Sequence, residues 1–194
     1  MLLDRRRFLV KERVAVLKLT DTYDILETET GTAIGIARDE PGTFTKLLRL
    51  VVEKRLLPTK LNIYELNGTA PVISLQKKPG LLRITVQVRD ADGSLLGSFR
   101  SKLFTLGGGF VIMDATGAKV AEVKGDWKGF NFRVLDSNGE ELGVVSKKWG
   151  GIAKEFFTSA DSYVISMSDT QAAANVSSAI ALAAGLAIDV VFKE

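Results

Sequence analysis

The C-terminal stretch QAAANVSSAIALAAGLAIDVVF, residues 171–192, decides the fold of this chain. Its 22 residues include no Lys, Arg, Glu or Pro, and Asp189 is the single charged residue. The apolar side chains are spread around the circumference of the predicted helix and form no single stripe, so the helix must be surrounded by protein or by lipid. At ~1.5 Å per residue such a helix would be ~33 Å long, which is enough to cross a bilayer.

Two interpretations of this helix compete. In one it is a C-terminal membrane anchor, and in the other it fills the interior of a closed barrel. Its many Ala, Gly and Ser residues suit a tight protein interior, and as an anchor it would place Asp189 at or near hydrocarbon. A carboxylate at the bilayer centre costs about 2.5–3.5 kcal/mol. The sequence therefore favours the barrel interior, where Asp189 would pair with a strand Lys or Arg or reach solvent.

Five segments upstream repeat one layout, in which two alternating runs flank a turn centred on glycine. Asn-Gly and Asp-Gly turns favour hairpins, because both residues tolerate positive φ and the turn then matches the twist of the strands. Each segment therefore predicts a pair of strands. The turn glycines are Gly31, Gly68, Gly93, Gly117 and Gly139.

The flanks of these turns carry the two-residue period of half-buried strands. Val86 and Val88 alternate with polar residues, and so do Phe132 and Val134. Residues 8–19 and 157–166 supply two further strands, for about twelve in all. Leucines and valines at helical spacing predict one short helix over residues 44–52.

About twelve hairpin-connected strands would leave open edges and a hollow interior unless they closed around a filling element. We therefore predict a mainly β protein: a closed antiparallel twelve-stranded barrel around a buried hydrophobic C-terminal helix. A single domain would span residues 1–194, with strands over about 8–168 and the helix over about 170–192. The sequence Ser168-Asp169-Thr170 offers helix N-caps.

Composition excludes several kinds of site. The chain has no Cys and no His, which removes disulfides, thiolate nucleophiles, the usual zinc ligands and Ser-His couples. Four carboxylates recur just before the predicted turns, and we expect each to stabilise its own turn and not to bind a metal. We therefore expect neither catalysis nor a cofactor. These carboxylates are Asp24, Asp90, Asp114 and Asp136.

The charge balance points weakly towards an anionic partner. Lys and Arg number 26 against 23 Asp and Glu, which gives a net charge of +3. This is far from the dense basic surface of a nucleic-acid-binding protein. The basic run Arg5-Arg6-Arg7 is not followed by a long apolar stretch, so we expect no secretory signal and a cytoplasmic protein.

Several of these segments resemble the phospholipid scramblase and LURP-one-related group of the Tubby C-terminal-like superfamily. The resemblance covers essentially the whole chain and rests on the repeated strand–turn–strand units, the apolar C-terminal helix, Tyr23-Asp24-Ile25-Leu26, Ser146-Lys147-Lys148-Trp149 and residues 157–163. It implies a twelve-stranded barrel around a central C-terminal helix. It also implies binding of phosphoinositide headgroups through basic surface residues, as in Tubby domains, and association with membrane lipids.

The chain departs from the animal scramblases in several respects, two of which concern lipidation and calcium. It has no Cys that could be palmitoylated. Residues 166–169 also carry too few carboxylates for a calcium loop. Both departures weaken any expectation of calcium-activated scrambling.

We expect the chain to be a non-enzymatic module that binds anionic phospholipid headgroups or a membrane surface, peripherally from the cytoplasm. The alternative is a protein-interaction or scaffold domain of the same fold with no lipid role, and the oligomeric state stays open. Basic side chains are the candidates for the binding site, although any of them could be ordinary solvated surface charges. Trp127 and Trp149 would lie at a lipid interface or, more simply, pack at the barrel rim. The candidate basic residues are Lys46, Arg49, Lys54, Arg55, Lys77, Lys78, Lys147 and Lys148.

Overall fold

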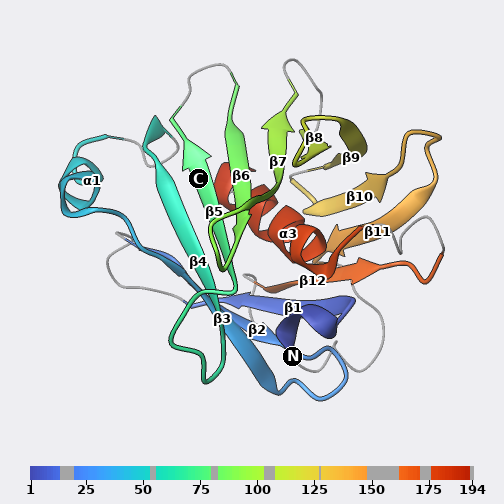
Figure 1. Ribbon diagram of the computed structural model, residues 1–194, viewed down its shortest axis with the longest axis horizontal. Helices are drawn as coiled ribbons and strands as arrows, with labels where there is room; N and C mark the ends of the chain where they lie inside the picture. Colours follow the sequence, from blue (N-terminus) through green and yellow to red (C-terminus); the bar gives the residue numbers. More distant parts are fainter. Residues whose placement is uncertain are drawn as a thin grey trace.

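The computed structural model describes residues 1–13, 20–52, 56–79, 83–102, 108–126, 128–147, 162–170 and 176–192. Twelve antiparallel strands pair in chain order, and β1 pairs with both β2 and β12, which closes the barrel (Figure 1). The strands are β1 Arg7–Glu12, β2 Thr22–Leu26, β3 Ala33–Asp39, β4 Thr59–Glu65, β5 Ile73–Lys78, β6 Thr85–Asp90, β7 Leu95–Ser101, β8 Gly109–Asp114, β9 Lys119–Asp126, β10 Asn131–Leu135, β11 Glu141–Ser146 and β12 Ser162–Met167. The helices are the 3-10 turn η1 Leu2–Asp4, α1 Thr43–Leu48 and α3 Ser178–Phe192.

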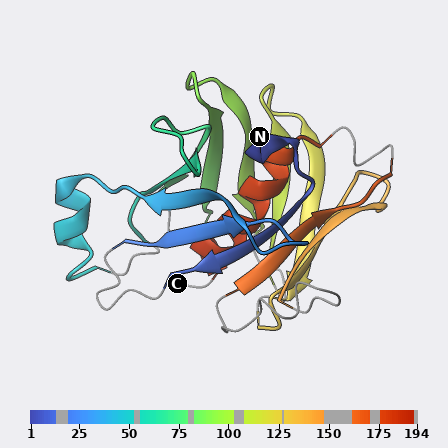
Figure 2. The same ribbon diagram turned by 90° about the horizontal axis from the view of Figure 1, so that it is seen from below.

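The α3 helix runs through the interior of the barrel, as both ribbon views show (Figures 1 and 2). Every residue from Ala181 to Val191 is buried, so the helix is surrounded on all its faces. Its small residues allow close contact with the wall: a Cβ atom added to Gly185 would lie 2.3 Å from Ile165 Cδ1 on β12. The predicted barrel with a central helix is confirmed, and the membrane-anchor interpretation is wrong.

No helix in the described residues combines the length and the apolar character needed to span a bilayer.

The start of α3 differs from the prediction. The helix begins at Ser178, and Ser177 is its N-cap, because the Ile180 N–H donates to Ser177 Oγ over 3.3 Å. Ser168, predicted as an N-cap, belongs to the barrel wall instead: its N–H donates to the carbonyl oxygen of Leu142 over 2.9 Å. Ser168 is therefore bonded to β11 and does not cap α3.

The five predicted hairpins all form, and they join β2–β3, β4–β5, β6–β7, β8–β9 and β10–β11. Four of the turn glycines adopt positive φ, from 67° at Gly31 to 88° at Gly117. Gly68 does not, so the expectation of a positive-φ turn at that position is wrong. Its N–H instead donates to the carbonyl oxygen of Glu65 over 2.9 Å, within a longer connection from β4 to β5.

Three of the four recurrent carboxylates stabilise their own turns as predicted. In each turn one Oδ1 atom accepts hydrogen bonds from the N–H groups two and four residues further along, for example from Thr116 and Ala118 at Asp114, over 2.9 and 3.0 Å. Asp90 and Asp136 accept the equivalent pairs. Asp24 was wrongly assigned to this set.

Asp24 lies within β2, away from the turn, and its carboxylate accepts two hydrogen bonds from Arg13 on the neighbouring chain segment, over 2.9 and 2.6 Å. In the first hairpin the turn carboxylate is Glu27, which accepts a hydrogen bond from the Thr30 hydroxyl over 2.8 Å. In this hairpin the sequence position of Asp24, ahead of the turn glycine, was therefore not enough to identify the carboxylate that stabilises the turn.

Asp189 does not reach solvent, because it is 2% exposed. It lies near two buried tyrosines, Tyr23 on β2 and Tyr163 on β12. Burial is the main cause that raises the pKa of both phenols well above 10, and the negative charge of Asp189 raises them further. Tyr23 also hydrogen-bonds Asp189, so a neutral phenol supports the carboxylate inside the barrel.

Candidate functional site

The two ends of the barrel differ in the chain segments that form them. The five glycine-centred hairpins gather at one end, which we call the hairpin end. The C-terminal ends of β3, β5 and β11 lie at the opposite end, the loop end. All the predicted site residues that the structure describes lie at these strand ends or follow them on α1 and at Lys147, so they share the loop end.

A hollow of about 430 Å³ at the loop end lies between α1, β4 and β5, and we call it the α1 groove. Among the described residues that line it are three lysines and one carboxylate, Glu40. Lys77 and Lys78 were predicted site residues, whereas sequence analysis missed Lys60. The lining residues are Glu40, Pro41, Gly42, Thr45, Pro58, Thr59, Lys60, Gln76, Lys77, Lys78 and Pro79.

Strand alternation gives the three lysines different roles in the groove. Lys77 is opposite Thr59 in the strand register and is 3% exposed, so it lies on the inward face of β5. Lys78 and Lys60 are exposed, Lys60 on the outward face of β4. The groove therefore presents two solvent-facing ammonium groups above a third that is buried in the wall, which suits an anion more than a cation.

The Glu40 carboxylate is held by side chains of β4. Glu40 accepts hydrogen bonds from Asn62 Nδ2 over 2.7 Å and from the Tyr64 hydroxyl over 2.8 Å. Burial and this bond to Glu40 raise the pKa of Tyr64. Each carboxylate oxygen accepts one of these bonds, and among the described residues no ion pair joins Glu40 to Lys60 or Lys78.

Arg49, a predicted ligand residue, has a structural position instead. Its guanidinium forms a two-pronged ion pair with Asp39 at the end of β3, and both side chains are almost fully buried. A buried and paired guanidinium cannot meet a ligand in solvent without losing that partner. We therefore interpret Arg49 as the residue that fixes α1 to the barrel beside the groove.

Two further predicted residues that the structure describes, Lys46 and Lys147, lie far apart on the barrel. Lys46 is exposed on α1, next to the groove. Lys147 follows β11 on the opposite wall, since five strands separate β5 from β11 in both directions around the barrel. The Lys147 ammonium lies over the Phe130 ring, 5.1 Å from its centroid. Lys54, Arg55, Lys148, Trp127 and Trp149 lie outside the described residues.

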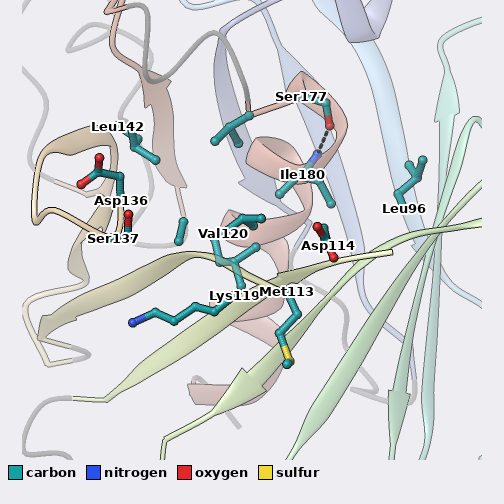
Figure 3. A pocket seen from close by; sticks show the side chains of 13 residues that line it. Leu96, Met113, Asp114, Lys119, Val120, Asp136, Ser137, Leu142, Ser177 and Ile180 are labelled. Atoms are coloured by element: carbon teal, nitrogen blue, oxygen red, sulfur yellow. Dashed lines mark hydrogen bonds between the residues drawn. The ribbon is translucent and has the colours of Figure 1, made fainter. Parts of the chain in front are cut away.

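A second hollow, of about 490 Å³, opens at the hairpin end beside the N-terminus of α3 (Figure 3). Its walls include apolar side chains such as Ile112 and Leu142. Of its described lining residues, Lys119 is the one that is basic, and it stands against the carboxylates of Asp114 and Asp136, which accept hydrogen bonds within their own turns. Bonds from Thr116 are the main cause that lowers the pKa of Asp114. This acidic rim does not fit an anionic headgroup.

Comparison with known proteins identifies the family of this chain. A family model described as Scramblase matches residues 78–194, which is more than half of the chain. The chain belongs to the scramblase family. The resemblance predicted from the repeated strand units is thereby confirmed at the level of this family, and membership links the chain to phospholipids. The match begins at the last residue of β5, so α1 and most of the α1 groove precede the matched scramblase segment.

No curated protein and no solved structure matches the chain.

Proposed function

We propose that this scramblase-family barrel is a non-enzymatic module that binds anionic phospholipid headgroups at a membrane surface through the α1 groove. The observation that carries the proposal is the convergence of Lys60, Lys77 and Lys78 in one hollow, with Lys46 exposed on the adjoining helix. An ammonium group near an anionic membrane contributes about 1 kcal/mol. Family membership supports a phospholipid as the source of the anion.

The two exposed lysines of the groove can be replaced to test headgroup binding without changing a buried side chain. Replacing Lys60 and Lys78 by Gln removes about 2 kcal/mol of attraction to an anionic surface, which corresponds to about thirtyfold weaker binding. The measurement is flotation with vesicles of phosphatidylcholine alone, of phosphatidylcholine with phosphatidylserine, and of phosphatidylcholine with a phosphoinositide. Binding of the unaltered chain should rise with anionic lipid and fall with added salt.

A matched control removes the same charge from the hairpin end. Arg7 and Lys119 are each 48% exposed and lie away from the groove, so their replacement by Gln should change binding much less than the groove variant does. Equal losses in the two variants would show that net charge and not the groove drives association. No binding to any anionic vesicle at low salt would refute the lipid proposal and favour the alternative, a protein-interaction domain of the same fold.

A further inference from the structure

The β3–β4 connection exposes a cluster of apolar side chains. In the part of the chain that the structure describes, seven large hydrophobic residues are exposed, and four of them fall within residues 44–51. Scattered exposed apolar residues are ordinary, but a contiguous group indicates a surface that another body covers. These four are Phe44 at 72%, Leu47 at 64%, Leu50 at 63% and Val51 at 81% exposure.

The helix is oriented with its apolar face outward. Phe44, Leu47 and Val51 follow the spacing of neighbours on one helical face, and backbone bonds continue the turn to Val52, whose N–H donates to the carbonyl oxygen of Leu48 over 2.9 Å. The opposite side of α1 carries Thr45, which lines the groove. This is the reverse of the usual surface helix, which buries its apolar stripe.

A buried ion pair fixes this orientation. Arg49 follows α1 directly and is held by Asp39 at the end of β3, with the two side chains 1% and 0% exposed. The apolar face cannot turn inward without removing Arg49 from that carboxylate. The outward exposure of Phe44 and Leu47 is therefore built into the attachment of α1 to the barrel.

Charge and position identify what covers this face. Lys46 lies on the same helix, and the exposed Lys60 and Lys78 line the groove beside it. Both ribbon views show α1 standing out from the barrel at one extreme of the molecule (Figures 1 and 2). Apolar side chains at the tip with ammonium groups behind them match the order of acyl chains and anionic headgroups in a membrane leaflet.

We propose that residues 43–52 form a membrane-insertion element, in which Phe44, Leu47, Leu50 and Val51 enter the boundary between headgroups and acyl chains of an anionic bilayer. The proposal rests on the proposed function and extends it, since the groove lysines attract the anionic surface and the α1 side chains provide the apolar contact. Insertion of this kind is shallow, because its apolar side chains come from one short helix and the turn after it.

The absence of cysteine in the chain makes single-site labelling a direct test. In the variants Leu47→Cys and Val51→Cys the new thiol carries the environment-sensitive fluorophore NBD, and roughly a third of the vesicle lipid is phosphatidylserine in phosphatidylcholine. We expect a blue shift at both sites on binding and quenching by lipids that carry a nitroxide on the acyl chain. A label at Leu66, which is 54% exposed in the β4–β5 connection, is the matched control and should not respond.

Polar substitution gives a second readout that does not depend on a label. Leu47→Gln and Val51→Gln change exposed side chains, so folding should be retained, and each should weaken vesicle binding by about tenfold. Val120→Gln alters a residue that is 42% exposed on β9 and should leave vesicle binding unchanged.

The outcomes separate the two proposals. If the unaltered chain binds anionic vesicles and the Lys60 and Lys78 variant weakens binding, but the labels at Leu47 and Val51 stay in water, insertion is refuted while headgroup binding stands. If the unaltered chain does not bind at all, both proposals are refuted. A blue shift without lipid that grows with protein concentration would show that a second copy covers α1 and would also refute insertion.

Discussion

The substitution Gly185→Ala adds one methyl group to α3 and so tests how tightly the barrel encloses this helix. A Cβ atom at this position would lie 2.3 Å from Cδ1 and 2.5 Å from Cγ1 of Ile165, which is itself buried on β12. In an exposed helix Gly→Ala stabilises by about 0.8–1 kcal/mol. Overpacking a closed core costs about 1–3 kcal/mol, so Gly185→Ala should lower the free energy of unfolding by up to ~2 kcal/mol.

The assay is urea unfolding followed by circular dichroism, with melting as a second measure. A loss of 1 kcal/mol corresponds to a fall in Tm of about 2–4 °C for a domain of this size. Ile165→Val removes the Cδ1 atom that the new methyl meets, so Gly185→Ala should cost less in that background, with a coupling of about 0.5–3 kcal/mol.

Gly68→Ala is a suitable control. A Cβ atom there would come no closer than 3.4 Å to its neighbours, at a φ outside the left-handed region. Its effect should stay within about 0.5 kcal/mol. If Gly185→Ala raised stability by about 1 kcal/mol, as in an open helix, the tight contact between α3 and β12 would be refuted.

Three further predictions concern the rest of the barrel. Asp39→Ala should destabilise the chain by about 3–5 kcal/mol, because it leaves the buried Arg49 guanidinium without that carboxylate; a loss below 1 kcal/mol in urea unfolding would contradict a buried pair. The pKa of Glu122 is lowered to about 2 by its ion pairs with Lys102, Lys124 and Lys119. Glu122 therefore stabilises the fold above the unfolded-state pKa near 4.5, and this contribution is lost as the pH falls towards 2. Glu122→Gln should accordingly be less stable than the unaltered chain at pH 7, and urea unfolding should show the difference shrinking in acid; a difference that did not depend on pH would argue against the ion pairs. Deleting residues 171–194 should give aggregates, since the barrel loses its filling helix, and a monomeric folded product on gel filtration would contradict this.

Local patterns predicted most of the fold. The alternation around Val86 and Phe132 gave the inward faces of their strands, because the period of two is a property of the extended backbone. Asp90, Asp114 and Asp136 support their turns through bonds that span only four residues, so the sequence contains both partners. Ser168 shows where this reasoning failed, since its competing partner Leu142 is 26 residues away in the chain.

The candidate site was predicted less well because it depends on strand register and helix orientation. Lys77 and Lys78 are adjacent in sequence, yet one lies in the barrel wall and the other in solvent, as alternation along β5 requires. A strand start at Thr59 after Pro58 was the signal that could have added Lys60. Arg49 and the apolar face of α1 carried no such signal, because Asp39 decides which side of the helix faces the barrel.

The sequence by itself determined that residues 171–192 need an enclosing wall and that five glycine-centred hairpins supply most of that wall, since burial of apolar area and turn geometry are local properties of the chain. Tertiary structure alone decided which charges meet. Closure of the barrel placed Lys60, Lys77 and Lys78 in one groove and Lys147 on the opposite wall. It also holds α1 with its apolar face outward, because turning Phe44 and Leu47 towards the barrel would take the buried Arg49 guanidinium away from Asp39.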